Sequence, residues 1–185
     1  RIGEVDVSFV PAGHVLGSAQ IVLEHAGERV VVSGDYKRRE DPTCEPFVPV
    51  PCDIFITEAT FGLPVFCHPP IEHEIAKLLK ARADHPDRCV LVGAYAHGKA
   101  QRVIAELRRA GHHEAIYLHG AMERMCLLYE EFGVGLGDLR LVSDAKKDEL
   151  RGAIVVCPPS ALNDRWSRRL PEPITAMAGG WMRGR

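Results

Sequence analysis

The sequence predicts an α/β fold with two parts, a β-rich part followed by a part in which strands alternate with helices. Up to about residue 66, short apolar runs alternate with Gly- and Pro-containing turns, and from about residue 70 apolar residues recur at helical spacing between further apolar runs. Strands that alternate with helices favour a parallel, wound sheet. We expect a first domain over 1–66, a second over 67–173, and a strand over 174–185 that returns to the first domain.

The first part is predicted to be built from strands. Alternating apolar residues over 5–9 predict one strand, and the runs 21–25 and 29–33 around Ala26-Gly27 predict a hairpin. A short apolar run over 53–57 predicts a further strand, reached through a proline-rich connection.

The second part is predicted to alternate between the two kinds of element. Pro69-Pro70 is typical of the residues before a helix, and Gly111 is typical of a helix end. The predicted helices begin at 71, cover 98–110 and 122–132, and run from a Ser160 cap to about 168. The predicted strands cover 89–93, 116–119, 139–142, 153–156 and 174–178.

Composition excludes several classes of protein. The 185 residues carry 23 Lys and Arg against 25 Asp and Glu, a net charge of −2, so the chain is not a bulk polycation. No apolar run approaches the roughly 18 residues of a membrane span, so we expect no membrane protein. None of the six cysteines forms a CxxC pair and the first residues lack a signal-peptide core, which predicts unpaired thiols in the cytoplasm. The sequence starts without Met and stops just after a strand-like run, so we expect a fragment of a longer protein.

Three polar clusters follow predicted strands. His14 lies in Pro11-Ala-Gly-His-Val-Leu-Gly-Ser18, Asp35 in Ser33-Gly-Asp-Tyr36, and Glu58 in Thr57-Glu-Ala-Thr-Phe-Gly62. One imidazole and one or two carboxylates suit a divalent ion such as zinc or manganese. Each cluster taken alone also fits an ordinary turn or a backbone cap, and that alternative stays open.

In this order the three clusters resemble the β-CASP nuclease family of the metallo-β-lactamase fold. The segments 93–101 and 157–166 and the run Ala178-Gly-Gly-Trp181 add to the resemblance, with most likeness to the subgroup of bacterial ligase-associated DNA exonucleases, also labelled mRNA 3′-end processing factor-like. The resemblance implies an α/β protein with a partial metallo-β-lactamase αββα sandwich and an inserted α/β, Rossmann-like β-CASP cap.

The resemblance also implies an activity and its residues. His14 would ligate one of two divalent metals, zinc or else manganese, and Asp35 would bridge both. Glu58 would orient a later histidine that protonates the leaving group, so Asp35 and Glu58 are the implied catalytic residues. The implied reaction is hydrolysis of phosphodiester bonds. We favour a DNA exonuclease in repair that works with a DNA ligase and a DEXH helicase, and RNA 3′-end processing is the alternative.

Further residues are candidates for contact with the nucleic acid. Tyr36 and Lys37 lie beside Asp35, Gly98 and Lys99 begin a predicted helix, and Ser160 and Arg165 lie in a second helix start, followed by Arg168 and Arg169. An ordinary strand–helix turn and a solvated charged face are the alternatives. We expect His97 and His119 to be polar residues of loops or strand ends and not metal ligands.

The sequence departs from the family pattern in ways that bear on activity. The HxHxDH signature has no match, and neither His112-His113 nor His68 with His73 has its spacing. The later histidine motifs of the family should follow the last predicted strand. We therefore expect the 185-residue chain to be inactive alone. Two other functions are possible. One is a small-molecule metallo-hydrolase, but enzymes of that class lack an insertion like the one that begins near residue 67. The other is a metal-free module that binds nucleic acid or a partner protein.

Overall fold

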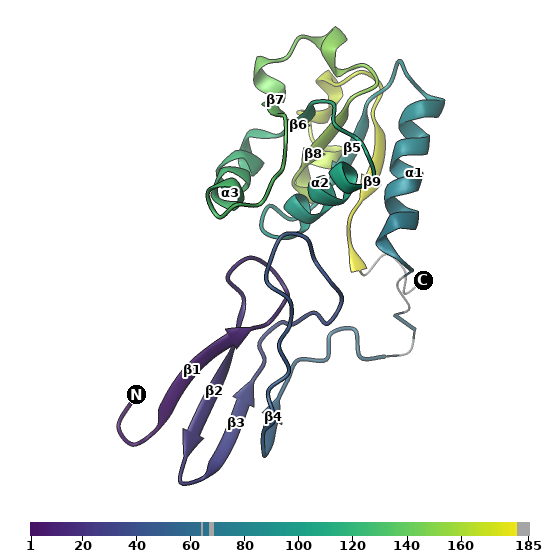
Figure 1. Ribbon diagram of the computed structural model, residues 1–185. Helices are drawn as coiled ribbons and strands as arrows, with labels where there is room; N and C mark the ends of the chain where they lie inside the picture. The colour runs from purple at the N-terminus through teal and green to yellow at the C-terminus, as the bar shows by residue number, and fades with distance from the viewer. Residues whose placement is uncertain (64, 67–68, 181–185) are drawn as a thin grey trace. The chain divides into compact units, whose positions relative to one another are not determined.

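A computed structural model describes residues 1–63, 65–66 and 69–180 of the chain. The chain divides into two compact units, Arg1–Pro64 and Val65–Arg185, and each unit contains its own β-sheet (Figure 1).

The first unit is a four-stranded mixed sheet. Its strands lie in the order β1 (Asp6–Pro11), β2 (Ala19–His25), β3 (Glu28–Val32) and β4 (Ile54–Ile56). β1 pairs with β2 and β2 with β3 in antiparallel register, which confirms the predicted hairpin, whereas β4 pairs with β3 in parallel register. The strands β1, β3 and β4 therefore run in the same direction, and their carboxyl ends lie at one edge of the sheet.

One face of this sheet carries the core of the first unit. Val22 and Val31 are buried on it, and so is the amide side chain of Gln20. The Gln20 Nε2 donates to Pro11 O at 3.2 Å and to Val48 O at 2.8 Å, which ties the connection before β4 to the sheet. A buried amide is tolerated here because its donors have partners.

The opposite face of the same sheet is apolar, and no described residue of the first unit buries it fully. We call it the open sheet face. Across the strands, Phe9 is opposite Ile21, Ile21 opposite Val32, and Val32 opposite Ile56, and directly opposed residues share a face. With the row two residues away, the open sheet face comprises Val7, Phe9, Ile21, Leu23, Val30, Val32, Ile54 and Ile56. Phe9 is 71% exposed and Ile56 53%.

The second unit is a five-stranded sheet in which every pairing is parallel, with strand order β7-β6-β8-β5-β9 (Figure 1). The strands are β5 (Val90–Gly93), β6 (Ile116–Leu118), β7 (Leu139–Leu141), β8 (Ile154–Cys157) and β9 (Ile174–Met177), and the helices are α1 (Ile71–Asp84), α2 (Lys99–Arg109) and α3 (Gly120–Glu131). All residues of β5, β6 and β8 are buried. The predicted α/β fold class and its parallel sheet are confirmed.

Different elements cover the two faces of the parallel sheet. Both α1 and α3 contact α2, and these helices carry buried apolar residues. The other face packs against three 3-10 segments, η1 (Val142–Asp144), η2 (Lys147–Leu150) and η3 (Pro159–Asn163), through a cluster that includes Leu91 and Val155. Leu170, which directly follows a fourth segment, η4 (Ser167–Arg169), belongs to the same cluster. None of the five cysteines among the described residues forms a disulfide bond. Burial raises the pKa of Cys89 to about 11 and that of Cys157 to about 12, so both stay protonated.

Two predicted elements differ from the structure. We expected the strand from residue 174 to return to the first domain, but β9 pairs with β5, and the Ala178 N–H donates to Gly93 O at 2.8 Å. Residues 181–185 lie outside the described part. The helix predicted from Ser160 to about 168 is instead the separate segments η3 and η4. Asp164 between them is extended, and its Oδ1 accepts the Arg165 N–H at 2.6 Å, a local bond that competes with helix formation. Ser160 lies inside η3 and caps nothing.

No helix in the described part of the chain combines the length and apolar character that a bilayer span requires.

Candidate functional site

The carboxyl edge of the first sheet gathers the three polar clusters. His14 follows β1, Asp35 follows β3 and Glu58 follows β4, so the topology places them at the same edge. The His14 Nε2 lies 3.7 Å from the Asp35 Oδ2, with side chains 43% and 71% exposed. The structure thus brings the two predicted metal ligands together from separate strand ends.

The loop that carries His14 is fixed by hydrogen bonds to Ser18 and by close backbone packing at Gly13. The Ser18 Oγ accepts the N–H groups of His14 at 3.0 Å and Val15 at 3.1 Å. Gly13 has a positive φ of 70°, and a Cβ there would lie 2.5 Å from Lys37 O and 2.7 Å from Phe47 N. A side chain at this position would displace the backbone that supports the loop, so only glycine fits.

Lys37 holds the same loop through its backbone and its side chain. Its N–H donates to Ala12 O at 3.0 Å, and its Nζ donates to His14 O at 3.2 Å and pairs with Asp41. The Asp41 Oδ1 accepts from Thr43 N at 2.9 Å and Thr43 Oγ1 at 2.6 Å. Burial alone would raise the pKa of Asp41, but the bonds from Lys37 and Thr43 and the Lys37 charge outweigh it and lower that pKa.

These contacts change the interpretation of two predicted nucleic-acid contacts. The Lys37 side chain is only 19% exposed, because its ammonium is used inside the unit. The Tyr36 ring lies 5.2 Å from the Phe47 ring and 6.2 Å from the Phe55 ring, so it packs within the first unit. Its stacking on a base stays a prediction. The sequence Asp41-Pro-Thr43 is typical of a turn in which the Asp side chain accepts from the backbone two residues later. This pattern could have identified Asp41, the partner of Lys37, as a structural residue.

Glu58 makes a local contact in this structure. Its Oε2 accepts the Thr60 N–H at 2.6 Å. The neighbouring Thr57 Oγ1 accepts from Ser33 Oγ at 3.2 Å, which links the ends of β3 and β4. The role of Glu58 in orienting a histidine stays a prediction.

The donor pair is compatible with a metal ion. Two atoms bound to one tetrahedral zinc at about 2.1 Å lie roughly 3.4 Å apart, close to the observed 3.7 Å between His14 and Asp35. Imidazole nitrogen and carboxylate oxygen are both zinc donors. Among the described residues, no group of three His, Cys, Asp or Glu side chains lies close enough to form a complete site.

The start of α2 in the second unit is the predicted phosphate site, and its backbone N–H groups have partners. Gly98 is buried, and its N–H donates to the Gln101 Oε1 at 2.9 Å. The Lys99 N–H donates to His97 O and the Ala100 N–H to Tyr95 O, each at 3.0 Å. The N–H groups that would bind a phosphate therefore have partners inside the unit.

The region after β6 and β8 holds the remaining candidates. Ser160 and Arg165 are exposed, and their contact with nucleic acid stays a prediction. His119 caps α3, since its Nδ1 accepts the Ala121 N–H at 3.0 Å, and its ring lies 4.6 Å from the Trp166 ring in an edge-on arrangement. The cap was missed at the sequence level because histidine is not among the usual helix-capping residues.

Comparison with known proteins links the chain to nucleases. No protein-family model matches it. It is 33% identical over 180 residues to a protein of Opitutus terrae named "Probable DNA ligase", across 95% of this chain and 17% of that protein. It is 34% identical over 145 residues to "Endoribonuclease ysh1" of Emericella nidulans, across 72% of this chain and 16% of that protein. It is 28% identical over 137 residues to "Cleavage and polyadenylation specificity factor 73" of Drosophila melanogaster, across 69% and 20%.

These relatives are several times longer than the chain, which spans about a sixth of the length of the first two. Their names are those of an endoribonuclease, a cleavage and polyadenylation factor and a DNA ligase, so the link to nucleic-acid enzymes does not select a subgroup. A solved structure from Enterococcus faecalis V583, described as a protein of unknown function, covers 97% of this chain and 42% of its own with 14% identity and a TM-score of 0.45. Likeness at that level does not define the fold.

Proposed function

We propose that the chain is part of a metal-dependent nuclease of the β-CASP family, which hydrolyses phosphodiester bonds in nucleic acid. The observation that carries the proposal is the approach of His14 and Asp35 to 3.7 Å from two separate strand ends. Relatives named as endoribonucleases over 72% of the chain support the same reaction class.

In this proposal His14 and Asp35 hold divalent metal, zinc or else manganese. Bound metal supplies a hydroxide nucleophile at neutral pH and neutralises charge on the scissile phosphate. Asp35 is 71% exposed and has two carboxylate oxygens, so it has the access needed to bridge two ions. Ser18 and Lys37 hold the His14 backbone in place, and the described residues offer no group of three ligands at this site.

The open sheet face supports the sandwich part of the proposal. Eight apolar side chains on one face of a four-stranded sheet need a second layer to exclude water. In a metallo-β-lactamase αββα sandwich a second sheet covers that face. The second unit corresponds to the α/β cap.

The favoured substrate is DNA, in an exonuclease that acts in cytoplasmic repair beside a DNA ligase and a helicase. The relative named "Probable DNA ligase", which aligns with 95% of the chain, supports this setting. The second candidate is an RNA 3′-end processing endonuclease, which the relatives named endoribonuclease favour.

Manganese titration tests the metal pair directly. In NMR spectra of the chain, Mn²⁺ should broaden the amide signals of residues 13–18 and 34–36 before all others. The variants His14→Ala and Asp35→Asn should each remove that broadening, whereas the matched variants His113→Ala and Asp144→Asn, both exposed in the second unit, should leave it intact. Broadening that spreads over acidic surface residues, or that survives in His14→Ala, would contradict the proposal.

Nuclease assays on the native polypeptide separate the two substrates. End-labelled single strands of DNA and RNA with one sequence are incubated with Zn²⁺ or Mn²⁺. We expect stepwise shortening of DNA, and a loss of at least 100-fold in Asp35→Asn. Internal cleavage of RNA with DNA untouched would favour the second candidate.

A further inference from the structure

The arginines of the second unit fall into two groups. Several are used within the fold: Arg82 pairs with Glu114, Arg88 donates to Glu172 O, Arg108 donates to four backbone carbonyls, Arg140 pairs with Asp138 and Arg151 with Asp148. In contrast, Arg165, Arg168 and Arg169 are exposed, and their guanidinium groups form no ion pair or hydrogen bond with any residue of the described part. The segment 164–169 carries these three positive charges and one negative charge, that of Asp164.

The segment that carries these three arginines is fixed to the sheet. In η3, Leu162 packs over Gly93, where a Cβ would lie 2.6 Å from the Leu162 Cδ1. Leu170 is 3% exposed, and the buried Ser167 donates its Oγ to Asp164 O at 2.8 Å. The arginines therefore project from an ordered backbone, which lowers the entropy cost of binding a ligand.

The segment also lies at a favourable place in the topology. It follows β8, and its neighbours in the sheet, β6 and β5, end at the same edge because all three strands are parallel. After β6 the chain enters α3, whereas after β8 it enters η3, which packs into the cluster on the opposite face. Ligands of parallel α/β sheets bind where successive connections leave to opposite faces.

Aromatic side chains accompany the arginines at this edge. Tyr95 follows β5 and is 58% exposed. The Trp166 ring meets the His119 ring at 4.6 Å beside Arg169, whose charge adds to burial in lowering the pKa of His119. Guanidinium groups bind phosphates through paired N–H donors, and an exposed ring offers a base a surface for stacking.

We propose that Arg165, Arg168 and Arg169 form the phosphate contacts of a binding surface for single-stranded nucleic acid on the second unit, with Tyr95 as its stacking residue. The inference deepens the proposed function by assigning where the strand is held. The metal pair His14 and Asp35 takes no part in it. An exposed tyrosine at the same edge of the parallel sheet favours a nucleic acid over an acidic peptide, because a peptide carboxylate has no base to stack.

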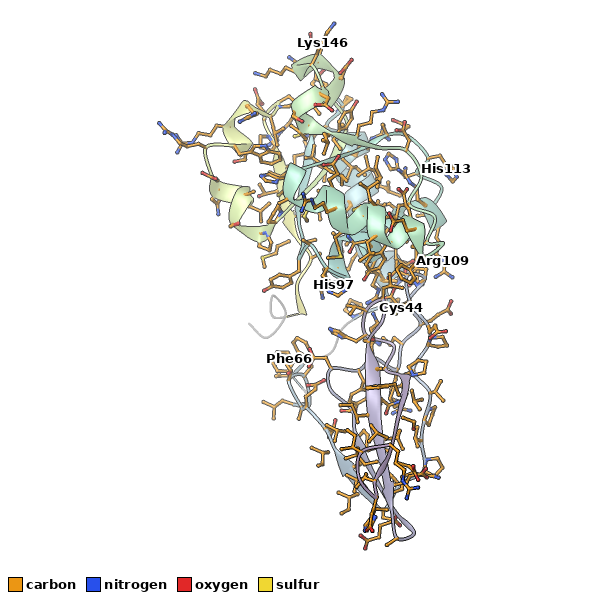
Figure 2. All side chains as sticks on the ribbon, turned by 90° about the vertical axis from the view of Figure 1, so that its left-hand side faces the viewer. Cys44, Phe66, His97, Arg109, His113 and Lys146 are labelled. Carbon is orange, nitrogen blue, oxygen red and sulfur yellow. The ribbon has the colours of Figure 1, made fainter. Side chains whose placement is uncertain are left out.

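Fluorescence anisotropy with a labelled 12-nucleotide single strand, in EDTA, tests this surface. The variant Arg165→Gln/Arg168→Gln/Arg169→Gln should bind at least 10-fold more weakly, and its dependence of log K on log salt should be shallower by about 2. The control Lys77→Gln/Lys146→Gln/Lys147→Gln removes the same charge from exposed positions and should bind within 2-fold of wild type. Lys146 lies at the opposite end of the second unit from His97 in the view of Figure 2.

Tyr95→Ala should weaken binding at least 5-fold without changing the salt slope, because stacking releases no counterions. Circular dichroism checks that each variant is folded, and the single variants Arg165→Gln and Arg168→Gln replace the triple variant if it is not.

Three outcomes would overturn the proposal: no binding by wild type, equal loss in the control variant, or displacement by polyglutamate as effective as by unlabelled strand. The last would identify a general anion surface. Since EDTA removes metal, failure here with manganese broadening at His14 intact overturns this surface alone. Failure of the manganese test with strand binding intact overturns the metal site alone.

Discussion

The two sheets of this chain differ in how fully they are covered. In the second unit both faces of the parallel sheet are packed, and every residue of β5, β6 and β8 is buried. In the first unit one face is packed, while the open sheet face keeps Phe9 71% and Ile54 51% exposed. Apolar patterning therefore indicates which sheet faces need a second layer. Among the described residues, the second unit covers both faces of its own sheet, whereas the first unit covers one face of its own.

The largest expected change in the free energy of unfolding comes from a substitution in the sheet of the second unit. Leu91 is completely buried in β5, so Leu91→Ala should lower the free energy of unfolding by about 3 kcal/mol. Both tryptophans of the chain, at 166 and 181, follow residue 65, so urea unfolding monitored by tryptophan fluorescence reports on the second unit. Leu127→Ala, at a 51% exposed position of α3, is the control and should change the free energy of unfolding by less than about 0.5 kcal/mol. Equal effects of the two variants would mean that β5 is not in a packed core.

The next effect concerns the half-covered sheet, where polar contacts hold the His14 loop. Asp41→Asn leaves the largely buried Lys37 ammonium without its counter-charge, and we expect a loss of about 2 kcal/mol, below the cost for a fully buried pair. In Asp41→Asn, backbone amide hydrogen exchange measured by NMR should become faster at residues 13–18. The exposed pair Lys77–Glu74 provides the control, since Glu74→Gln should cost less than about 0.5 kcal/mol. Unchanged exchange around His14 would show that Lys37 does not position the loop.

The smallest effect is a pH dependence of the second unit. The His119 Nδ1 accepts the Ala121 N–H only when the imidazole is neutral, and burial, then the Arg169 charge, lower its pKa in the fold against the opposing effect of Asp164. The unfolded chain therefore binds a proton more readily than the folded chain does. This part of the stability is complete above pH ~6.5 and is lost as pH falls through the lowered pKa.

We expect the lost cap to cost about 1 kcal/mol between pH 7.5 and 5. His119→Asn retains a side-chain acceptor that does not titrate, so its urea midpoint should change less with pH than that of wild type. Burial also lowers the pKa of His112, but His112 is present in both proteins and its effect cancels in the comparison. Identical pH profiles would exclude His119 as a titrating cap.

Local signals predicted most of the elements. The hairpin β2–β3 follows from a two-residue turn between apolar runs, and α1 begins directly after Pro70. The partner of β9 was not predictable, because a short apolar strand carries no information on which sheet edge it joins. Likewise, the break at Asp164 depends on one side-chain bond to the next residue.

For the candidate site, the pairing of His14 with Asp35 was predictable from their positions after strands. The structural uses of Lys37 and Tyr36 were not, since their partners Asp41 and Phe47 lie in a connection without regular structure. The hydrogen bond from the Gly98 N–H at the start of α2 was predictable. Gln101 is at the third helical position, from which a side chain can accept from the backbone N–H before the helix.

The strand order of the second unit has a consequence for biosynthesis. Both neighbours of β5 come from late in the chain, since Val90 is opposite Ile154 on one side and Ile174 on the other. During translation the apolar segment 89–93 leaves the ribosome long before either partner exists, with both hydrogen-bonding edges unsatisfied. Such a nascent strand is a template for wrong pairing until residue 177 has been synthesised.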